Sequence, residues 1–145
     1  MTMLKVLLLL GASLLAACSG EPAKAPAKAS ATSAVQIANV TQLTGDAEAG
    51  RVGFGQCRSC HTVEAGVNRV GPSLHAIVGR PVGTVADYRY STAMAAVGGV
   101  WDDQRLYDFL ENPREHVPGT KMTFAGIKDG QRRADIIAWL KTQAD

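Results

Sequence analysis

The chain has 145 residues, of which 46% are hydrophobic and 19% are charged, and its formal net charge is +2. Lys5, Lys24, Lys28 and Glu21 precede residue 46, so the remaining 100 residues carry twelve basic and twelve acidic side chains. This balance does not predict nucleic-acid binding, which requires a basic patch or stripe. One hundred residues suffice for a single domain with a modest core.

The first predicted element is a signal peptide over residues 1–17. Lys5 gives it a positive start, and the apolar run over residues 6–17 is shorter than the roughly 20 residues of a membrane span. Leu15-Ala16-Ala17-Cys18 resembles a bacterial lipobox, which predicts cleavage before Cys18 and acylation of that cysteine. We therefore expect an exported protein on the periplasmic side, anchored to a membrane by lipid. The alternative is an ordinary signal peptide with an incidental cysteine.

A linker follows over residues 18–45. It is rich in Ala, Pro and Ser and lacks apolar periodicity, a composition typical of flexible, partly extended chain. An alternative is that residues 35–43 pack on the domain as an N-terminal extension. The domain itself is predicted over residues 46–145.

The most informative motif is Cys57-Arg58-Ser59-Cys60-His61. The pattern C-x-x-C-H is the attachment signature of c-type haem. Each of the two thiols can form a thioether with one porphyrin vinyl group, and the adjacent histidine can bind the iron through a ring nitrogen. The motif predicts one covalent haem c, attached through Cys57 and Cys60, with His61 as the first axial ligand.

Three helices are predicted, and strand signals are weak. The first runs from an N-cap at Asp46 toward the haem motif, the second runs from an N-cap at Asp102 to Pro113, and the third begins near Gln131. In the second helix, apolar residues recur at i, i+3 and i+4 from Leu106, which indicates one buried face. The fold class is therefore all-α, with loops wrapped around a large group.

Met122 is the predicted second axial ligand. It follows the turn-forming sequence Pro118-Gly119-Thr120-Lys121, and a thioether ligand favours ferrous iron and so raises the reduction potential. Met94 lies in a less distinctive run, and the two remaining methionines fall within the signal segment. His61 and Met122 are thus the two predicted ligands of the iron.

The chain resembles the class I cytochromes c of the mitochondrial and alphaproteobacterial type. The resemblance covers residues 45–145 and implies the class I cytochrome c fold. It rests on residues 45–50, residues 57–64, Gly71-Pro72-Ser73-Leu74-His75, Gly79-Arg80, Tyr90, Trp101, Leu110-Glu111-Asn112-Pro113, residues 118–122 and Phe124-Ala125-Gly126-Ile127-Lys128.

The resemblance implies roles for individual residues. The carbonyl of Pro72 is expected to accept a hydrogen bond from His61, and the first helix is expected to cross the last at Gly50. The residues expected near the haem propionates are Arg80, Tyr90, Trp101 and Thr120.

The sequence also departs from the family. Phe109 stands where many relatives have a tyrosine bonded to the methionine sulfur, and Met94 replaces a polar residue that is often asparagine, so we expect a drier distal side. Glu115 stands where relatives often have lysine, which weakens electrostatic steering. The basic residues that remain around the haem edge are Arg58, Arg114, Lys121 and Lys128.

The resemblance implies a monomeric electron carrier rather than an enzyme. Its expected partners are a donor of the quinol–cytochrome c reductase type and a terminal oxidase or reductase as acceptor. One alternative is a haem protein with a labile Met122 that acts as a weak peroxidase or binds a gas, and another is a fixed haem subunit of a larger redox enzyme. A third treats Cys57 and Cys60 as a thiol–disulfide pair, but the βαβ pattern typical of that class is absent.

Overall fold

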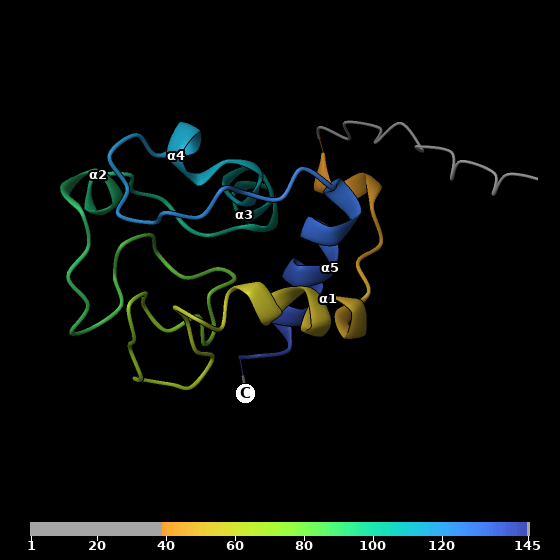
Figure 1. Cartoon of the computed structure of the whole chain (residues 1–145), viewed down its shortest axis with the longest axis horizontal. Coiled ribbons are helices and arrows are strands. Elements are labelled where there is room, and N and C mark those ends of the chain that lie inside the picture. Colours follow the sequence, from red (N-terminus) through yellow and green to blue (C-terminus); the bar gives the residue numbers. More distant parts are fainter. Residues whose placement is uncertain (1–38, 145) are drawn as a thin grey trace, which may run out of the picture. The chain divides into compact units, whose positions relative to one another are not determined.

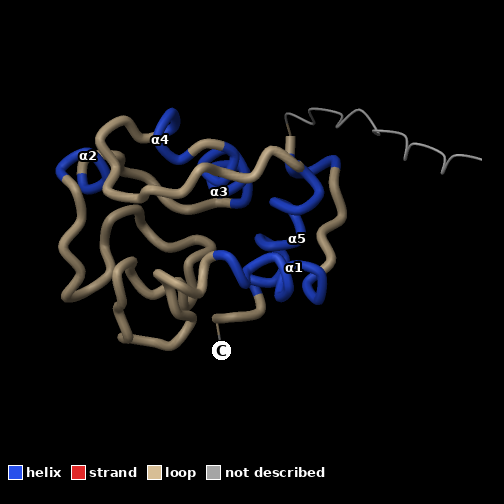
Figure 2. The backbone as a smooth tube through the Cα atoms, viewed as in Figure 1, coloured by secondary structure: helices blue, strands red, loops and turns tan. Residues whose placement is uncertain are grey.

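The computed structural model describes residues 39–144, and all the regular elements in that range are helices (Figure 2). The backbone otherwise forms loops, with one isolated bridge between Pro81 and Val100. This architecture confirms the predicted all-α class. The elements, in chain order, are η1 Val40–Gln42, α1 Ala47–Gly53, η2 Phe54–Gln56, α2 Thr92–Ala95, α3 Asp103–Glu111, α4 Pro113–His116 and α5 Gly130–Lys141.

Side-chain caps explain where the longer helices begin. The Asp46 carboxylate accepts hydrogen bonds from the backbone N–H groups of Glu48 and Ala49, and Asp102 and Asp129 cap α3 and α5 in the same way. These caps satisfy N–H groups that have no partner within the helix. The three predicted helices are confirmed, and α5 begins one residue earlier than predicted.

The first and last helices cross at close range (Figure 1). A Cβ atom at Gly50 would overlap the backbone carbonyl of Asp135, so only glycine lets the two backbones approach this closely. Beside this point, the rings of Phe54 and Trp139 lie 4.4 Å apart, centroid to centroid. The crossing is the one that the family resemblance implied. The haem motif follows it directly in the chain, because Cys57 comes immediately after η2.

Helix α3 supplies another wall of the core. Leu106, Phe109 and Leu110 are buried on the predicted face, and Tyr107 is buried beside them. The helix also packs against α5. Long loops join η2 to α2 and α4 to α5 (Figure 2). These loops and α3 leave a space between them that becomes the functional site.

Among the described residues, Val40 packs on the domain, although it lies inside the segment predicted as linker. The Val40 side chain is buried, and its backbone N–H donates to Oε1 of Gln104 on α3 at 2.9 Å. The signal segment, Cys18 and the linker as far as residue 38 lie outside the described residues. Within residues 39–144, no helix is long and apolar enough to cross a membrane.

Candidate functional site

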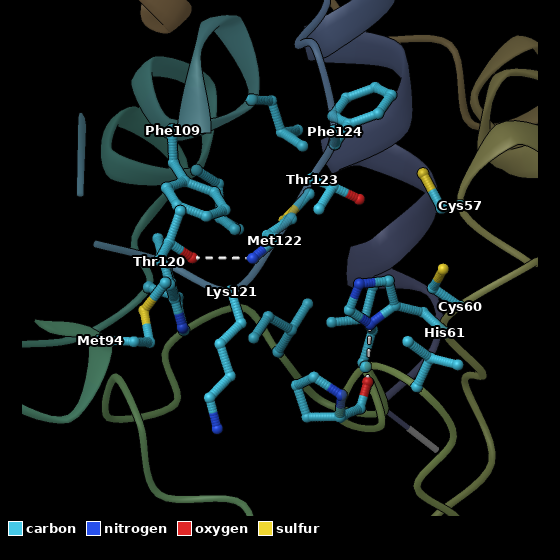
Figure 3. A pocket seen from close by; sticks show the side chains of 18 of the residues that line it. Cys57, Cys60, His61, Met94, Phe109, Thr120, Lys121, Met122, Thr123 and Phe124 are labelled. Atoms are coloured by element: carbon cyan, nitrogen blue, oxygen red, sulfur yellow. Dashed lines mark hydrogen bonds between the residues drawn. The ribbon is translucent and has the colours of Figure 1, made fainter. Parts of the chain in front are cut away.

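A cavity of about 590 Å³ lies between the haem motif, the long loops and α3. Figure 3 shows Cys57, Cys60 and His61 on one side of it, and Phe109, Thr120 and Met94 on the other. Its lining is mostly apolar, as is usual for cofactor sites. It brings together nine of the predicted site residues: Cys57, Cys60, His61, Pro72, Arg80, Tyr90, Trp101, Thr120 and Met122.

A tight turn presents the haem motif to the cavity. The N–H of Cys57 donates to the carbonyl of Phe54 at 2.8 Å, which closes η2. The N–H groups of Cys60 and His61 both donate to the carbonyl of Cys57, at 3.1 and 2.9 Å. This turn places both thiols and the imidazole along the same wall.

The His61 ring is oriented by one hydrogen bond. Its Nδ1 lies 2.8 Å from the carbonyl oxygen of Pro72. A carbonyl can only accept, so Nδ1 carries the proton and Nε2 is the lone-pair nitrogen of the neutral ring. A Cβ atom at residue 71 would collide with this ring, so Gly71 leaves the space that the imidazole needs. Burial lowers the pKa of His61, outweighing the opposing effect of the Pro72 bond, and favours the neutral ring that can bind a metal.

The two cysteines are free thiols that face the cavity. Burial, and secondarily the neighbouring Cys60, raises the pKa of the Cys57 thiol to about 11. Thiol–disulfide oxidoreductases instead lower the pKa of their nucleophilic cysteine to stabilise its thiolate. The environment of Cys57 therefore argues against the thiol–disulfide alternative.

Met122 lies on a loop that is fixed just before it. Its backbone N–H donates to Oγ1 of Thr120 at 3.2 Å. The ammonium of Lys121 donates to the carbonyls of Arg89 and Tyr90, at 3.1 and 3.3 Å. These bonds join the methionine loop to the loop that enters α2.

The wall beside Met122 is apolar. Phe109 and Met94 are buried and line the cavity, and the ring centroid of Phe109 lies 5.0 Å from that of Trp101. These are the two positions at which the family resemblance predicts polar residues in many relatives. The wall consequently offers an aromatic ring and a thioether at these positions, and neither side chain carries a hydroxyl or an amide.

Polar groups collect at another part of the lining. The Arg80 guanidinium donates to the carbonyls of His75 and Ser73, at 2.7 and 2.9 Å. The Tyr90 hydroxyl accepts from the N–H of Val85 at 3.4 Å, which leaves its own proton available for another acceptor. Burial raises the pKa of Tyr90 and lowers that of Arg80. A neutral phenol and a guanidinium side by side suit a carboxylate ligand.

Three contributors to this site were not predicted from the sequence. Tyr88 was not among the predicted site residues, but its hydroxyl donates to the Val70 carbonyl at 2.9 Å and the residue lines the cavity. Helix α2 was not predicted either, although Ser91 is a recognisable N-cap residue and accepts from the N–H of Met94. The bridging role of Lys121 had no local signal, because its carbonyl partners are about 30 residues away in the chain.

The lining fits a covalently held haem. It provides two thiols and an oriented neutral imidazole on one wall, a thioether on a separate loop, and cationic and phenolic groups for carboxylates. Most of the remaining lining is apolar, as a porphyrin ring requires. A haem held here would supply one-electron transfer, and side chains of the lining would be the ligands of its iron.

Several known cytochromes c are similar to this chain in sequence. The chain is 50% identical to cytochrome c of Euglena viridis over 102 residues, which cover 70% of this chain and all of that protein. It is 42% identical to cytochrome c of Arabidopsis thaliana, over 75% of this chain and 98% of that one. A cytochrome c homolog of Rickettsia conorii is 46% identical over 72% of this chain, which spans 61% of that homolog.

The fold has a solved counterpart. Cytochrome cH from Methylobacterium extorquens is similar with a TM-score of 0.65 and 44% identity, covering 68% of this chain and 99% of that one. No family model matches the sequence.

Proposed function

The chain belongs to the class I cytochromes c, and from this premise we propose the set of residues with which it holds and uses its haem. It is a monohaem electron carrier with one haem c attached covalently through Cys57 and Cys60. When bound, the haem supplies an iron that accepts and gives up one electron. The observation that supports the proposed residue set is their convergence on one cavity from separate segments of the chain.

His61 and Met122 are the proposed axial ligands. The assignment of His61 rests on its Nδ1 bond to Pro72, which orients the ring, fixes its tautomer and increases the basicity of Nε2. Met122 is favoured over Met94 because the bonds made by Thr120 and Lys121 fix its backbone at the cavity. Met94 is buried within the apolar wall, where a thioether serves as ordinary packing.

A pair of methionine variants tests the second ligand. Met122→Leu should abolish the weak near-infrared absorption of ferric iron bound to thioether sulfur and should lower the reduction potential. Met94→Leu is the matched control, because it removes a second sulfur from the same cavity, and it should keep the band. Retention of the band in Met122→Leu, or its loss in Met94→Leu, would show that the ligand is misassigned.

The propionates are assigned to the polar part of the lining. Arg80 supplies the cation, while Tyr90, Trp101 and Thr120 supply neutral donors. Tyr90 and Thr120 already accept backbone hydrogen bonds, which hold their hydroxyl oxygens in place and leave their protons to donate. Replacing Tyr90 with Phe should change the reduction potential, because a donor to a carboxylate affects the charge near the iron. Tyr88→Phe is the control for the loss of a cavity-lining hydroxyl.

We propose no enzymatic activity for the chain. With His61 and Met122 both bound, no axial position is open to a substrate, and electrons would pass through the haem edge instead. Carbon monoxide should therefore bind the reduced protein weakly at neutral pH. Tight binding would favour the alternative function as a weak peroxidase or gas binder.

The proposed setting is the periplasmic face of a membrane, reached by export and lipid attachment at Cys18. The support is the signal-like N-terminus, together with a haem attachment that takes place outside the bacterial cytoplasm. The proposed partners are a quinol–cytochrome c reductase type donor and a terminal oxidase or reductase as acceptor. Tethering raises their effective concentration.

Intact mass spectrometry of protein extracted from membranes tests the setting. The expected mass corresponds to residues 18–145 with one haem and acyl chains, and Cys18→Ala should lack the acyl mass while keeping the haem. Haem without lipid in the unmutated protein would make Cys18 incidental.

A further inference from the structure

Arg133 is a buried cation that the haem assignment leaves without a role. Its side chain is only 3% exposed, although it lies in the first turns of α5. Burying a charge is costly unless it is paired and hydrogen-bonded, and the N-terminal end of a helix disfavours a positive charge further. Arg133 therefore needs partners that compensate for the burial of its charge.

These partners come from two other parts of the fold. One terminal nitrogen of Arg133, Nη1, donates to the carbonyl of Ile127 at 2.6 Å and to that of Lys128 at 3.2 Å. The other, Nη2, lies 3.5 Å from the carboxylate of Glu111, and the guanidinium stacks 4.0 Å from the centre of the Tyr107 ring. Arg133 thus joins α5 and α3 to the end of the loop that carries Met122.

The same stretch of loop makes further bonds to the end of α3. The N–H of Ile127 donates to the carbonyl of Leu110 at 2.8 Å, and the ammonium of Lys128 donates to the carbonyl of Glu111 at 3.2 Å. Gly126 lies so close to Glu111 that a Cβ atom would overlap its carbonyl. The loop is therefore clamped at residues 126–128, four to six positions after Met122.

We propose that Arg133 is a positioning residue for Met122: by holding the Ile127 and Lys128 carbonyls against α3, it keeps the methionine loop closed over the cavity. Thr120 and Lys121 fix the loop before Met122, and the Arg133 clamp fixes it afterwards. Loss of the Arg133 bonds leaves this end of the loop held only by the bonds of Ile127 and Lys128 to α3, and lets Met122 leave more often. This inference rests on the proposed assignment of Met122 as an axial ligand.

Imidazole binding to the ferric haem-loaded protein measures how often the loop opens. Imidazole can take the axial position only when Met122 is away, so its apparent affinity is proportional to the open fraction. Arg133→Met keeps a side chain of similar length and removes every donor. We expect its imidazole affinity to rise about tenfold or more, with a rise of about threefold for Arg133→Lys, which retains one donating group.

Two controls separate positioning from general stability. Arg132→Met removes an exposed charge from the same helix, and Ile137→Val weakens the buried face of α5 but keeps every donor of Arg133. Both should change imidazole affinity by less than about twofold. Replacing only one partner of a buried ion pair usually destabilises a fold, because the groups left behind lose their bonds. A purely structural Arg133 would therefore alter thermal unfolding but leave imidazole affinity unchanged.

A rise in the imidazole affinity of the Arg133 variants, with faster hydrogen exchange at the Ile127 amide, supports the inference. If the thioether band is present and is lost in Met122→Leu, unchanged affinity in both Arg133 variants overturns the inference and leaves the ligand assignment standing. If the unmutated protein lacks the band, the ligand assignment fails and the inference falls with it. Should Arg133→Met not retain haem, Arg133→Lys decides the question: a rise below about twofold, no larger than that of the controls, overturns the inference.

Discussion

The crossing of α1 and α5 and the loop that carries Met122 are held by different kinds of interaction. The crossing joins two helices through direct backbone approach at Gly50 and through the contact of two tilted aromatic rings next to the haem motif. The loop around Met122, by contrast, has no helix of its own and is fixed through separate points before and after the methionine, at residues 120–121 and 126–128.

The difference separates two tasks. The residues for covalent attachment and the first ligand follow directly after the crossing of α1 and α5. Close-packed helices resist local opening, so these residues are held rigidly. The second ligand lies on a segment whose bonds can break singly, and such segments open at lower free energy than core helices. Damage to the crossing should therefore affect the whole fold, whereas damage to the loop should affect mainly the iron environment.

The largest expected effect is at the crossing. Gly50→Ala places a methyl group against the Asp135 carbonyl and the Trp139 side chain, so the helices must separate. The free energy of unfolding should fall by about 3 kcal/mol or more, measured by thermal denaturation of the haem-loaded protein. Gly55→Ala is the control, because its new methyl would have no neighbour within 4 Å. Equal melting temperatures for the two variants would refute the account of the crossing.

A smaller and more local effect is expected in the loop. Gly126 has φ +90°, a conformation that favours glycine, and its Cβ position overlaps the Glu111 carbonyl. Gly126→Ala should lower the free energy of opening the loop by about 2 kcal/mol. The expected signature is a weakened thioether band at temperatures where the helical circular dichroism is intact. Simultaneous loss of both signals would show that the loop and the crossing unfold as one unit.

Much of the helical framework could be predicted because its signals are local. Asp46, Asp102 and an apolar stripe starting at Leu106 are enough to set two helices, since capping and periodicity depend on residues three or four positions apart. The C-x-x-C-H motif and the family resemblance then supplied the site residues. The four-residue helices α2 and α4 were not predicted, because they are too short to show periodicity.

Polar contacts between residues far apart in the chain could not be predicted from the sequence. Nothing in the run Gln131-Arg132-Arg133 indicates that one arginine is exposed and its neighbour buried, because the difference depends on Tyr107, Glu111 and the loop carbonyls. The hydrogen bond from the Val40 N–H to the Gln104 side chain similarly joins residues 64 positions apart. Such contacts follow from the assembled tertiary structure rather than from a local pattern.

The dry wall behind Met122 allows a test of the loop side that leaves the crossing alone. Phe109→Tyr adds one hydroxyl to a buried position beside the cavity. A polar group there should stabilise the more highly charged ferric state, lowering the reduction potential by roughly 20–60 mV, the equivalent of one hydrogen bond. Thermal stability should change little. An unchanged potential and an unchanged pH of ligand exchange would contradict the idea of a dry distal side.

The smallest effect concerns the surface near the loop. Glu115 is exposed on α4, and Lys121 and Lys128 already donate to backbone carbonyls, which ties down two cations of a thin basic ring. Electron transfer from the haem-loaded protein to an acidic redox partner should therefore slow by less than about threefold between low and physiological ionic strength. Glu115→Lys changes the local charge by two units and should steepen this dependence without altering the reduction potential. The substitution leaves both the crossing and the loop clamp intact, so a change in salt dependence would report on surface charge alone. A steep salt dependence in the unmutated protein would contradict the prediction and would place the steering charges elsewhere on the surface.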